Sequence, residues 1–298
     1  MTPPERRSVR VDGVIRVTED GWREDHDRLA AEEPLEIRLA YWEAGERVEK
    51  PIAVTMRTPG DDFELAVGFL FGEGIIRRRS DFVEVYYCLD TSEQQNYNIV
   101  SVSLMPDVPF DMSRLDRHFY TTSSCGVCGK AALEALEISG CDVIPPGFTV
   151  SAEVVMSLPE TLRAAQAVFQ QTGGLHAAGL FDRDGNLLSL REDVGRHNAL
   201  DKVIGEQVTA GNTRLSDRLV LLSGRASFEL LQKSLVAGVP VVAAVGAPSS
   251  LAVELAHSFG ITLIGFTRPD GFNIYTHPDR VLRPVPIPTD VANIRQEA

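Results

Sequence analysis

The chain has 298 residues, 44% of them hydrophobic and 24% charged, which is the composition of a folded globular protein with room for two domains. Its formal net charge of −13 excludes the broadly basic surface that nucleic acids and anionic membranes require of a binding partner. Four cysteines in a chain of this length exclude a fold held together by a disulfide framework.

The sequence carries no sign of export or membrane insertion. No apolar segment follows the charged first seven residues, so we expect no secretory signal. The most apolar run, residues 235–245, is interrupted by Gly238 and Pro240 and is too short to span a bilayer. We therefore expect a cytoplasmic protein.

The first third of the chain predicts a leader and a small domain. Residues 1–33 are rich in charge and predict a partly ordered leader with one strand, over residues 9–17. Apolar and polar residues alternate over residues 35–42 and again over residues 48–57, a pattern that predicts a hairpin.

A helix and two more strands complete this domain. Asp61 or Asp62 is expected to cap the helix, whose large apolar side chains, Phe63 among them, are expected in the core. Strands are predicted over residues 82–89 and 97–104. Residues 34–112 thus predict a small α+β domain.

Residues 113–147 are predicted to form a linker that carries a Cys-x-x-Cys loop. Cys125 and Cys128 are followed by an alanine- and leucine-rich segment that predicts a helix over residues 131–138. A helix amino terminus and the cation of Lys130 both favour the thiolate, which is the form that attacks sulfur or binds metal. In a chain without an export signal, this pair indicates redox, sulfur-transfer or metal chemistry.

Residues 148–283 predict a three-layer α/β domain, and residues 284–298 a surface tail. Helical and strand patterns alternate, and the middle strands are continuous apolar runs typical of a sheet buried on both faces. Ser151 is expected to cap a helix that continues to Phe169. The strands are expected over residues 177–182, 187–192, 218–222, 239–245 and 262–266, and further helices over residues 198–208, 228–236 and 250–258.

Four junctions between strands and helices in this domain have the composition of ligand-binding turns. Small residues allow a ligand to approach the backbone N–H groups, and a helix amino terminus favours an anion. Arg196 and Arg225 could donate to phosphate from two of these turns, and His176 and His197 could contact a ligand or serve in packing. The four turns are residues 173–179, 191–198, 223–227 and 246–250.

In order and number, these motifs strongly resemble the formate dehydrogenase accessory sulfurtransferase family (FdhD). The resemblance covers roughly residues 34–277. Its motifs are Thr58-Pro-Gly-Asp-Asp, Gly68-Phe-Leu-Phe-Gly-Glu-Gly74, Ser124-Cys-Gly-Val-Cys-Gly129, Thr172-Gly-Gly-Leu-His, Glu192-Asp-Val-Gly-Arg-His-Asn, Ser223-Gly-Arg-Ala-Ser227 and Gly246-Ala-Pro-Ser-Ser.

The resemblance implies a sulfurtransferase that receives persulfide sulfur from a cysteine desulfurase. It would pass the sulfur to the molybdenum (or tungsten) bis-guanine-dinucleotide cofactor on which formate dehydrogenase activity depends. Cys125 would carry the persulfide and Cys128 would be its neighbour. One guanine nucleotide of the cofactor would lie against Phe266, Thr267, Arg268, Pro269, Asp270 and Gly271, with Arg196, His197 and Arg225 as further candidate ligands.

The resemblance also implies that the carboxy-terminal domain is similar in fold to cytidine deaminases. Zinc deaminases use an H-x-E motif on one helix and P-C-x-x-C on the next. Here the corresponding helix starts read Gly195-Arg-His-Asn-Ala199, without the glutamate, and Ser223-Gly-Arg-Ala-Ser227, without a cysteine. We therefore expect the fold without its zinc site.

Other interpretations remain open from the sequence. Cys125 and Cys128 could bind a structural zinc together with His118 and Cys141. A thioredoxin-like pair is disfavoured, because nothing around residues 100–140 indicates that fold. A chaperone that holds the cofactor without chemistry would need the arginines and not Cys125. A symmetric dimer, with one pocket for each nucleotide of the cofactor, is a further hypothesis.

Overall fold

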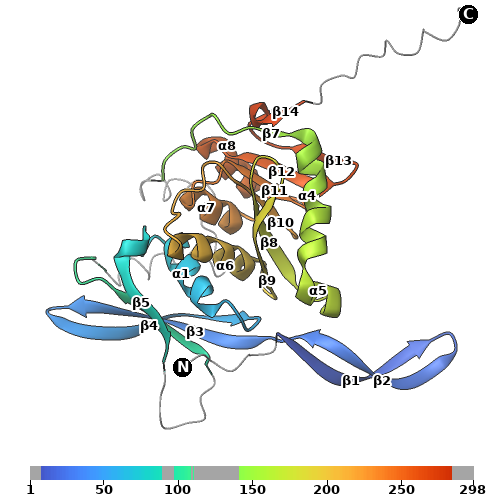
Figure 1. Ribbon diagram of the computed structural model, residues 1–298, viewed down its shortest axis with the longest axis horizontal. Coiled ribbons are helices and arrows are strands. Elements are labelled where there is room, and N and C mark those ends of the chain that lie inside the picture. The colour runs from blue at the N-terminus through green and yellow to red at the C-terminus, as the bar shows by residue number, and fades with distance from the viewer. Residues whose placement is uncertain (1–7, 89–96, 109, 111–140, 284–298) are drawn as a thin grey trace, which may run out of the picture.

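The computed structural model describes residues 8–88, 97–108, 110 and 141–283 (Figure 1). Cys125, Cys128, His118, the helix expected over residues 131–138 and the tail from residue 284 lie outside the described residues. Within these ranges, no helix has the length and apolar character needed to cross a bilayer.

The amino-terminal unit is a four-stranded sheet with a helix on one face. The strands run in the order β4-β3-β6-β5, and β3 pairs antiparallel with β4, which confirms the predicted hairpin. Helix α1 follows β4 and packs against the core strands through Leu65, Ala66 and Leu70. The bounds are β3 Glu33–Glu43, β4 Glu46–Arg57, α1 Asp62–Gly72, β5 Phe82–Tyr87 and β6 Ile99–Leu104, with a 3-10 turn, η1, at Arg79–Asp81.

Two local expectations in this unit are wrong. Asp61 occupies the N-cap position of α1, yet its side chain caps no backbone N–H. The carboxylate of Asp62 is instead buried against Arg57, which donates from Nε to Oδ1 at 2.9 Å and from an amino group to Oδ2 at 2.8 Å. Phe63 is 37% exposed rather than in the core, and its ring centre lies 4.8 Å from that of Tyr87.

The carboxy-terminal unit is a six-stranded sheet in the order β13-β12-β11-β10-β8-β9. Strands β10, β11 and β12 are parallel, whereas β8 runs antiparallel to both of its neighbours. One hydrophobic cluster joins α4 to one face of the sheet, and a second joins α6, α7 and α8 to the other. The three layers confirm the predicted α/β class (Figure 1).

The bounds in this unit agree closely with the expected segments, with two exceptions. The long helix ends at Ala165, because Gln166 leaves the helical conformation, and a short helix follows. Strand β13, which extends the sheet at one edge, has no counterpart among the expected strands, and neither do the two-residue strands β7 and β14. The elements are β7 Val150–Ser151, α4 Ala152–Ala165, α5 Ala167–Thr172, β8 His176–Phe181, β9 Leu187–Asp193, α6 Arg196–Thr209, β10 Leu219–Leu222, α7 Phe228–Val236, β11 Val241–Ala244, α8 Ser250–Phe259, β12 Thr262–Arg268, β13 Gly271–Ile274, η2 Pro278–Arg280 and β14 Val281–Leu282.

The two units share one hydrophobic core across the contact between α1 and α6. Two glycines bring these helices unusually close together. A Cβ atom on Gly68 would lie 1.8 Å from the carbonyl oxygen of Asp201, and one on Gly205 would lie 1.8 Å from that of Glu64. Only glycine fits at either position, so these two residues determine where the amino-terminal unit lies on α6.

The predicted leader is more ordered than expected. Residues from 8 onward form a ribbon of two antiparallel strands, β1 (Val9–Thr18) and β2 (Gly21–Ala30). The expected strand over residues 9–17 is therefore confirmed, and its partner strand was missed. The ribbon extends away from both units (Figure 1).

Candidate functional site

The candidate site lies along one edge of the six-stranded sheet. Because β10, β11 and β12 are parallel, their carboxyl ends reach the same edge. Strand β8 runs the other way, so its first residue, His176, lies there beside Asp193, the last residue of β9. We call this the carboxyl edge: His176 and residues 193–197, 223–227, 245–249 and 266–268.

Backbone hydrogen bonds hold the loops of the carboxyl edge against one another. The amide of Gly246 donates to the carbonyl of Gly224 at 2.9 Å, and the amide of Phe266 donates to the carbonyl of Gly246 at 3.1 Å. A Cβ atom on Gly246 would lie 3.0 Å from the Gly224 oxygen, so a larger residue would push the loops apart. The three strand ends thus form one connected backbone surface.

Two helices begin at this edge without a side-chain cap. Helix α6 starts after Gly195, which has no side chain. Helix α7 starts after Ser227, whose hydroxyl accepts from no N–H of the helix. Arg196 and Arg225 are exposed beside these starts, and within the described ranges neither makes an ion pair. Amide donors and guanidinium groups together form an electropositive surface suited to an anion such as phosphate.

Two histidines lie in the same edge. Nε2 of His197 is 3.2 Å from the hydroxyl of Ser227 and 3.5 Å from a carboxylate oxygen of Glu229. Burial lowers the pKa of His197, and burial together with the cation of Arg196 lowers the pKa of His176. Both rings are therefore neutral at pH 7 and able to donate or accept one hydrogen bond at each nitrogen.

Beside His197 the edge opens into a cavity of about 430 Å³ between the two units. The carboxy-terminal unit contributes a polar wall that includes His197, Asp201 and Glu229. The amino-terminal unit contributes an apolar wall that includes Met56 and Phe69. A ligand at the start of α6 would therefore contact both units.

A buried carboxylate fixes the start of α6. Oδ1 of Asp193 accepts from the amide of Gly195 at 2.8 Å and from the side chain of Asn198 at 2.9 Å. Oδ2 is 2.8 Å from Nζ of Lys202 and accepts from the amide of Thr58 at 3.1 Å. Asp193 is fully buried, so these contacts compensate its charge and tie the carboxyl edge to the amino-terminal unit.

The residues of this network were missed as a structural unit, although their signal is in the sequence. Asp193 and Asn198 lie in the segment 191–198 that we interpreted as a ligand turn, and Lys202 lies beyond it in α6. An acidic side chain at the end of a strand, followed by amide and basic side chains on the next helix, indicates a buried polar network as readily as a ligand site.

A second buried ion pair lies at the polar wall of the cavity. Nζ of Lys233 is 2.9 Å from Oδ1 of Asp201, and both side chains are almost completely buried. Burial raises the pKa of Asp201 to about 7. Glu73 and Glu229 each place a carboxylate oxygen 4.0 Å from the same ammonium group, so α7 carries a cation surrounded by acids.

A family model, described as the FdhD/NarQ family, matches residues 30–282 of this chain. The chain belongs to the FdhD/NarQ family. The resemblance drawn from the motifs is thereby confirmed, and the match includes every residue of the carboxyl edge.

Relatives in this family are similar along nearly their whole length. The sulfur carrier protein FdhD of Streptomyces coelicolor is 49% identical over 272 residues, covering 90% of this chain and 94% of its own. That of Mycobacterium tuberculosis is 51% identical over 263 residues, covering 86% and 92%. That of Saccharolobus solfataricus is 41% identical over 268 residues, covering 90% and 96%.

A solved structure agrees with the fold. A protein from Desulfotalea psychrophila, described as a formate dehydrogenase accessory protein, aligns with a TM-score of 0.70 at 25% identity, over 93% of this chain and 100% of that chain. A guanine deaminase from Nitrosomonas europaea aligns over 42% of this chain and 82% of its own, with a TM-score of 0.30 and 17% identity. A score that low supports no conclusion about this chain.

The structure brings most of the candidate ligands to the carboxyl edge. Arg196 and His197 begin α6, Arg225 precedes α7, and Phe266 to Arg268 end β12. This last segment was expected after the final core strand. It lies instead within β12, at an irregularity where Phe266 takes a positive φ of 54° and is 40% exposed.

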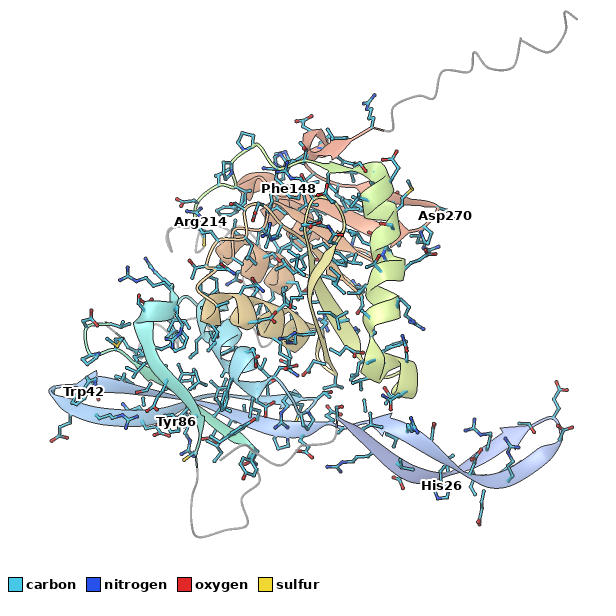
Figure 2. All side chains as sticks on the ribbon, in the orientation of Figure 1. His26, Trp42, Tyr86, Phe148, Arg214 and Asp270 are labelled. Carbon is cyan, nitrogen blue, oxygen red and sulfur yellow. The ribbon has the colours of Figure 1, made fainter. Side chains whose placement is uncertain are left out.

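The neighbouring residues of that segment differ in their surroundings. Thr267 is buried and donates to the carbonyl of Ala244 at 3.0 Å, so it supports the backbone of β11. Pro269 and Asp270 form the exposed turn between β12 and β13, and Asp270 points outward at the rim (Figure 2). Ligand binding by these residues stays a prediction, as do the roles of Cys125 and Cys128.

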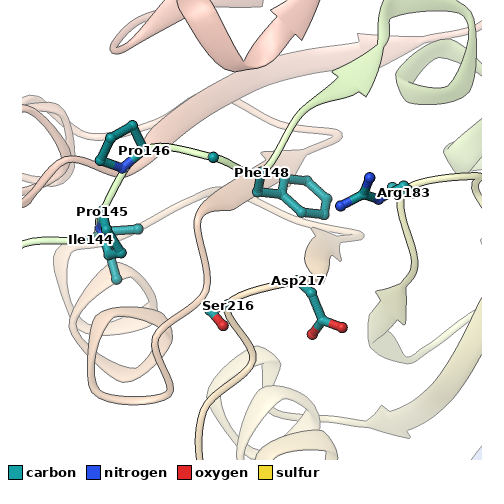
Figure 3. Close-up of a pocket in the computed structure, with 8 residues that line it drawn as sticks. Ile144, Pro145, Pro146, Phe148, Arg183, Ser216 and Asp217 are labelled. Carbon is teal, nitrogen blue, oxygen red and sulfur yellow. The ribbon is translucent and has the colours of Figure 1, made fainter.

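A smaller cavity, of about 230 Å³, lies at the opposite edge of the sheet. Ser216 and Asp217 precede β10, and Arg183 follows β8 (Figure 3). The guanidinium of Arg183 stands 6.0 Å from the ring centre of Phe148. The strand directions place this cavity away from the carboxyl edge.

Proposed function

We propose that this protein is a sulfur carrier that serves formate dehydrogenase. Cys125 would receive sulfur as a persulfide from a cysteine desulfurase and deliver it to the molybdenum (or tungsten) bis-guanine-dinucleotide cofactor. The family match over residues 30–282, a range that contains Cys125 and Cys128, is the observation that carries the proposal. Relatives named as sulfur carrier proteins and the accessory protein from Desulfotalea psychrophila support it.

The first step is a thiol exchange that needs no external oxidant. The Cys125 thiolate attacks the outer sulfur of the donor's persulfide, and that sulfur's bond to the donor cysteine breaks. The donor leaves as a thiolate, and Cys125 holds the transferred sulfur atom.

Delivery can follow either of two routes. In one, the deprotonated outer sulfur of Cys125 binds the metal of the acceptor, and a two-electron reductant, such as a reduced state of that metal, breaks the sulfur–sulfur bond, so that Cys125 leaves as a thiolate and sulfide stays with the acceptor. In the other, the Cys128 thiolate attacks the inner sulfur, a Cys125–Cys128 disulfide forms, and hydrosulfide leaves with the bonding electron pair. A Cys128→Ala variant that delivers sulfur at the full rate would exclude the second route.

The acceptor cofactor would be the substrate of this transfer, and the carboxyl edge suits the phosphates of its nucleotides. The uncapped starts of α6 and α7 offer amide donors, and Arg196 and Arg225 are exposed and without an ion pair in the described part of the chain. His176 and Arg225 lie beside the backbone at Gly224 and Gly246, at 3.3 Å and 3.1 Å from the position that a Cβ atom would take. The proposed ligands therefore match the chemistry of a diphosphate.

Two further features belong to the proposal. We place the protein in the cytoplasm, where a reduced Cys125 would persist, and we propose a dimer that supplies one carboxyl edge for each nucleotide of the cofactor. A complex of one chain with one cofactor would contradict the dimer. It would leave sulfur transfer untouched.

The alternative functions predict different outcomes for one substitution. In a Cys125→Ser variant, sulfur transfer predicts that cofactor binding is kept while activation of formate dehydrogenase is lost. A chaperone without chemistry predicts that both are kept. Cys141→Ser is the matched control, because its half-buried thiol has a pKa raised by burial and is a poor nucleophile.

Zinc at the cysteine loop is tested separately. His118, Cys125 and Cys128 lie outside the described residues, so the zinc interpretation stays a prediction. Metal analysis of the purified protein decides it: one zinc per chain, lost in a His118→Ala variant, would support a structural site in place of a persulfide.

A further inference from the structure

The two strands β1 and β2 form an arm, residues 9–30, that stands apart from both units (Figure 1). It lies almost entirely before residue 30, where the family match begins. Its root is held by Arg10, which donates to Glu33 at 2.7 Å, and by Arg28, which donates to Gln171 in α5 at 3.1 Å. Beyond the root, side chains on both faces of the arm point into solvent (Figure 2).

The arm is incomplete as a sheet. Neither of its strands pairs with a third strand among the described residues. A lone two-stranded ribbon is marginally stable in water, and an unprotected edge readily accepts another strand. The edge strand β1 has the sequence Val-Arg-Val-Asp-Gly-Val-Ile-Arg-Val-Thr, which is rich in β-branched residues and has no lysine or proline to block pairing.

The arm also carries two unfavourable charge pairs. Asp12 lies directly opposite Asp27, and Arg16 lies directly opposite Arg23. Like charges in such positions destabilise a pair of strands. Arg16 is partly compensated by a diagonal contact of 2.7 Å to Asp25, whereas Asp12 has no cation within ion-pair distance in the described structure.

We propose that β1 pairs antiparallel with β1 of a second copy of this chain, with Val14 on the twofold axis. In that register Asp12 faces Arg16 of the second copy, and Arg16 faces Asp12 of the second copy. Asp12 thereby gains a cation that β2 does not supply, and Arg16 gains a second carboxylate in addition to Asp25. On the other face, Val11 of each copy faces Val17 of the other, a β-branched pair that favours strand association.

The charges favour this register over the one about Gly13, and the β1 edge over the β2 edge. Moving the axis to Gly13 would place Arg10 opposite Arg16 of the second copy, which is repulsive. Pairing through β2 about Asp25 would place that carboxylate opposite itself, and α5 packs against the root of β2. Pairing through β1 gives a continuous four-stranded antiparallel sheet in the order β2-β1-β1-β2, in which each β1 has a neighbouring strand on both sides.

The inference rests on the proposed dimer and not on sulfur transfer. It assigns the contact to a segment outside the carboxyl edge, so each copy keeps its own edge exposed. A chain that fails to dimerise through β1 can still form a persulfide on Cys125, so the two proposals can fail separately.

A charge-swap series on the full-length chain tests the proposal. Sedimentation velocity should give a dimer for the unaltered chain. Arg16→Asp and Asp12→Arg should each raise the dimer dissociation constant by about tenfold or more, because two attractive pairs become two repulsive ones. The double variant Asp12→Arg/Arg16→Asp should restore the dimer, since it re-forms both pairs with their signs exchanged.

Asp12→Arg cannot act by weakening the arm itself, whereas Arg16→Asp also removes the contact of Arg16 to Asp25, a loss that the control Arg23→Asp shares through its own contact to Asp25 at 3.6 Å. Arg16→Asp places an acid opposite Arg23, and Asp12→Arg places a base opposite Asp27, so each removes one repulsion within the ribbon. Arg23→Asp is the matched control, because it makes the same change of charge on β2 and should leave the dimer intact. A monomer for the unaltered chain at about 100 µM, a concentration that populates even a weak interface, or equal effects of Arg16→Asp and Arg23→Asp, would overturn the proposal.

Discussion

At the scale of single residues, the candidate site depends on charges buried beneath it. Asp193 and Asp201 both lie on the boundary between the units, and each is paired with a lysine, Lys202 and Lys233 respectively. Neither carboxylate faces the electropositive surface itself. They determine where Gly195, Arg196 and His197 lie. Their effect on a ligand is therefore indirect, through the placement of these three residues.

Removing the charge of Asp193 should destabilise the fold strongly. In an Asp193→Asn variant the ammonium of Lys202 stays buried without its counterion, which costs about 3–5 kcal/mol when one member of a buried pair is removed. Denaturant unfolding measures the loss. Asp270→Asn, on the exposed turn, should change the free energy of unfolding by less than ~0.5 kcal/mol, and a similar change in Asp193→Asn would contradict the network.

Asp201 should make stability depend on pH between its two pKa values. Burial raises the pKa from 3.8, its unfolded value, to about 7 in the folded protein. The folded state then binds the proton more tightly, so this contribution to stability is complete below pH 3.8 and is lost as the pH rises through about 7. The free energy of unfolding, measured from pH 5 to pH 8, should fall more steeply for the unaltered chain than for Asp201→Asn. Parallel curves would contradict the raised pKa.

At the scale of the elements, the contact between α1 and α6 positions the amino-terminal unit. Gly68 and Gly205 let the two backbones touch, and the polar network around Asp193 then ties Thr58 to the start of α6. The cavity beside His197 exists because these two helices meet at this distance.

Adding one methyl group at that contact should therefore separate the helices. In a Gly205→Ala variant the new Cβ atom would lie 1.8 Å from the Glu64 carbonyl, and neither backbone can yield without moving its helix. We expect a loss of about 1–3 kcal/mol in the free energy of unfolding, typical of overpacking. Gly174→Ala, whose nearest neighbour would be at 3.7 Å, is the control. Equal stability of the two variants would show that the helices adapt.

The sequence was sufficient to predict the elements whose signal is local. The hairpin of β3 and β4, the cap at Ser151 and the alternating elements of the six-stranded sheet follow from periodicity and turn residues. Strands β2 and β13 were missed because charged or short segments form them only where a neighbouring strand is present. The cap expected at Asp61 failed because the backbone there turns left-handed, with φ of 53°, and because Arg57 binds the adjacent carboxylate.

The site was predictable in composition and not in arrangement. Arg196, His197 and Arg225 lie at strand-to-helix junctions, where α/β proteins bind ligands, and the structure brings these junctions to one edge. No local pattern could show that Asp193 and Lys202 form a buried pair that reaches Thr58. That contact joins residues more than 130 positions apart and depends on the packing of two units.

At the scale of the whole molecule, the protein combines an electropositive edge with a negative overall charge. The formal net charge is −13, whereas Arg196, Arg225 and Arg268 are all exposed along or beside the carboxyl edge. The proposed phosphate-bearing ligand would thus be attracted to this edge although the chain as a whole is negatively charged. Substituting both Arg196 and Arg225 by glutamine should weaken binding of guanosine diphosphate by about tenfold or more, as expected for two charge-assisted contacts. Unchanged binding by calorimetry would remove the edge as the nucleotide site.

The central claim, that Cys125 carries sulfur, is tested most directly by mass spectrometry of the full chain. The protein is incubated with a cysteine desulfurase and cysteine, and its cysteine-containing peptides are then compared with those of a sample that lacks the desulfurase. The account predicts one added sulfur atom on the peptide that contains Cys125, absent in Cys125→Ser and retained in Cys88→Ser. A Cys125 that gains no sulfur from an active donor, or added sulfur that persists in Cys125→Ser, would contradict it.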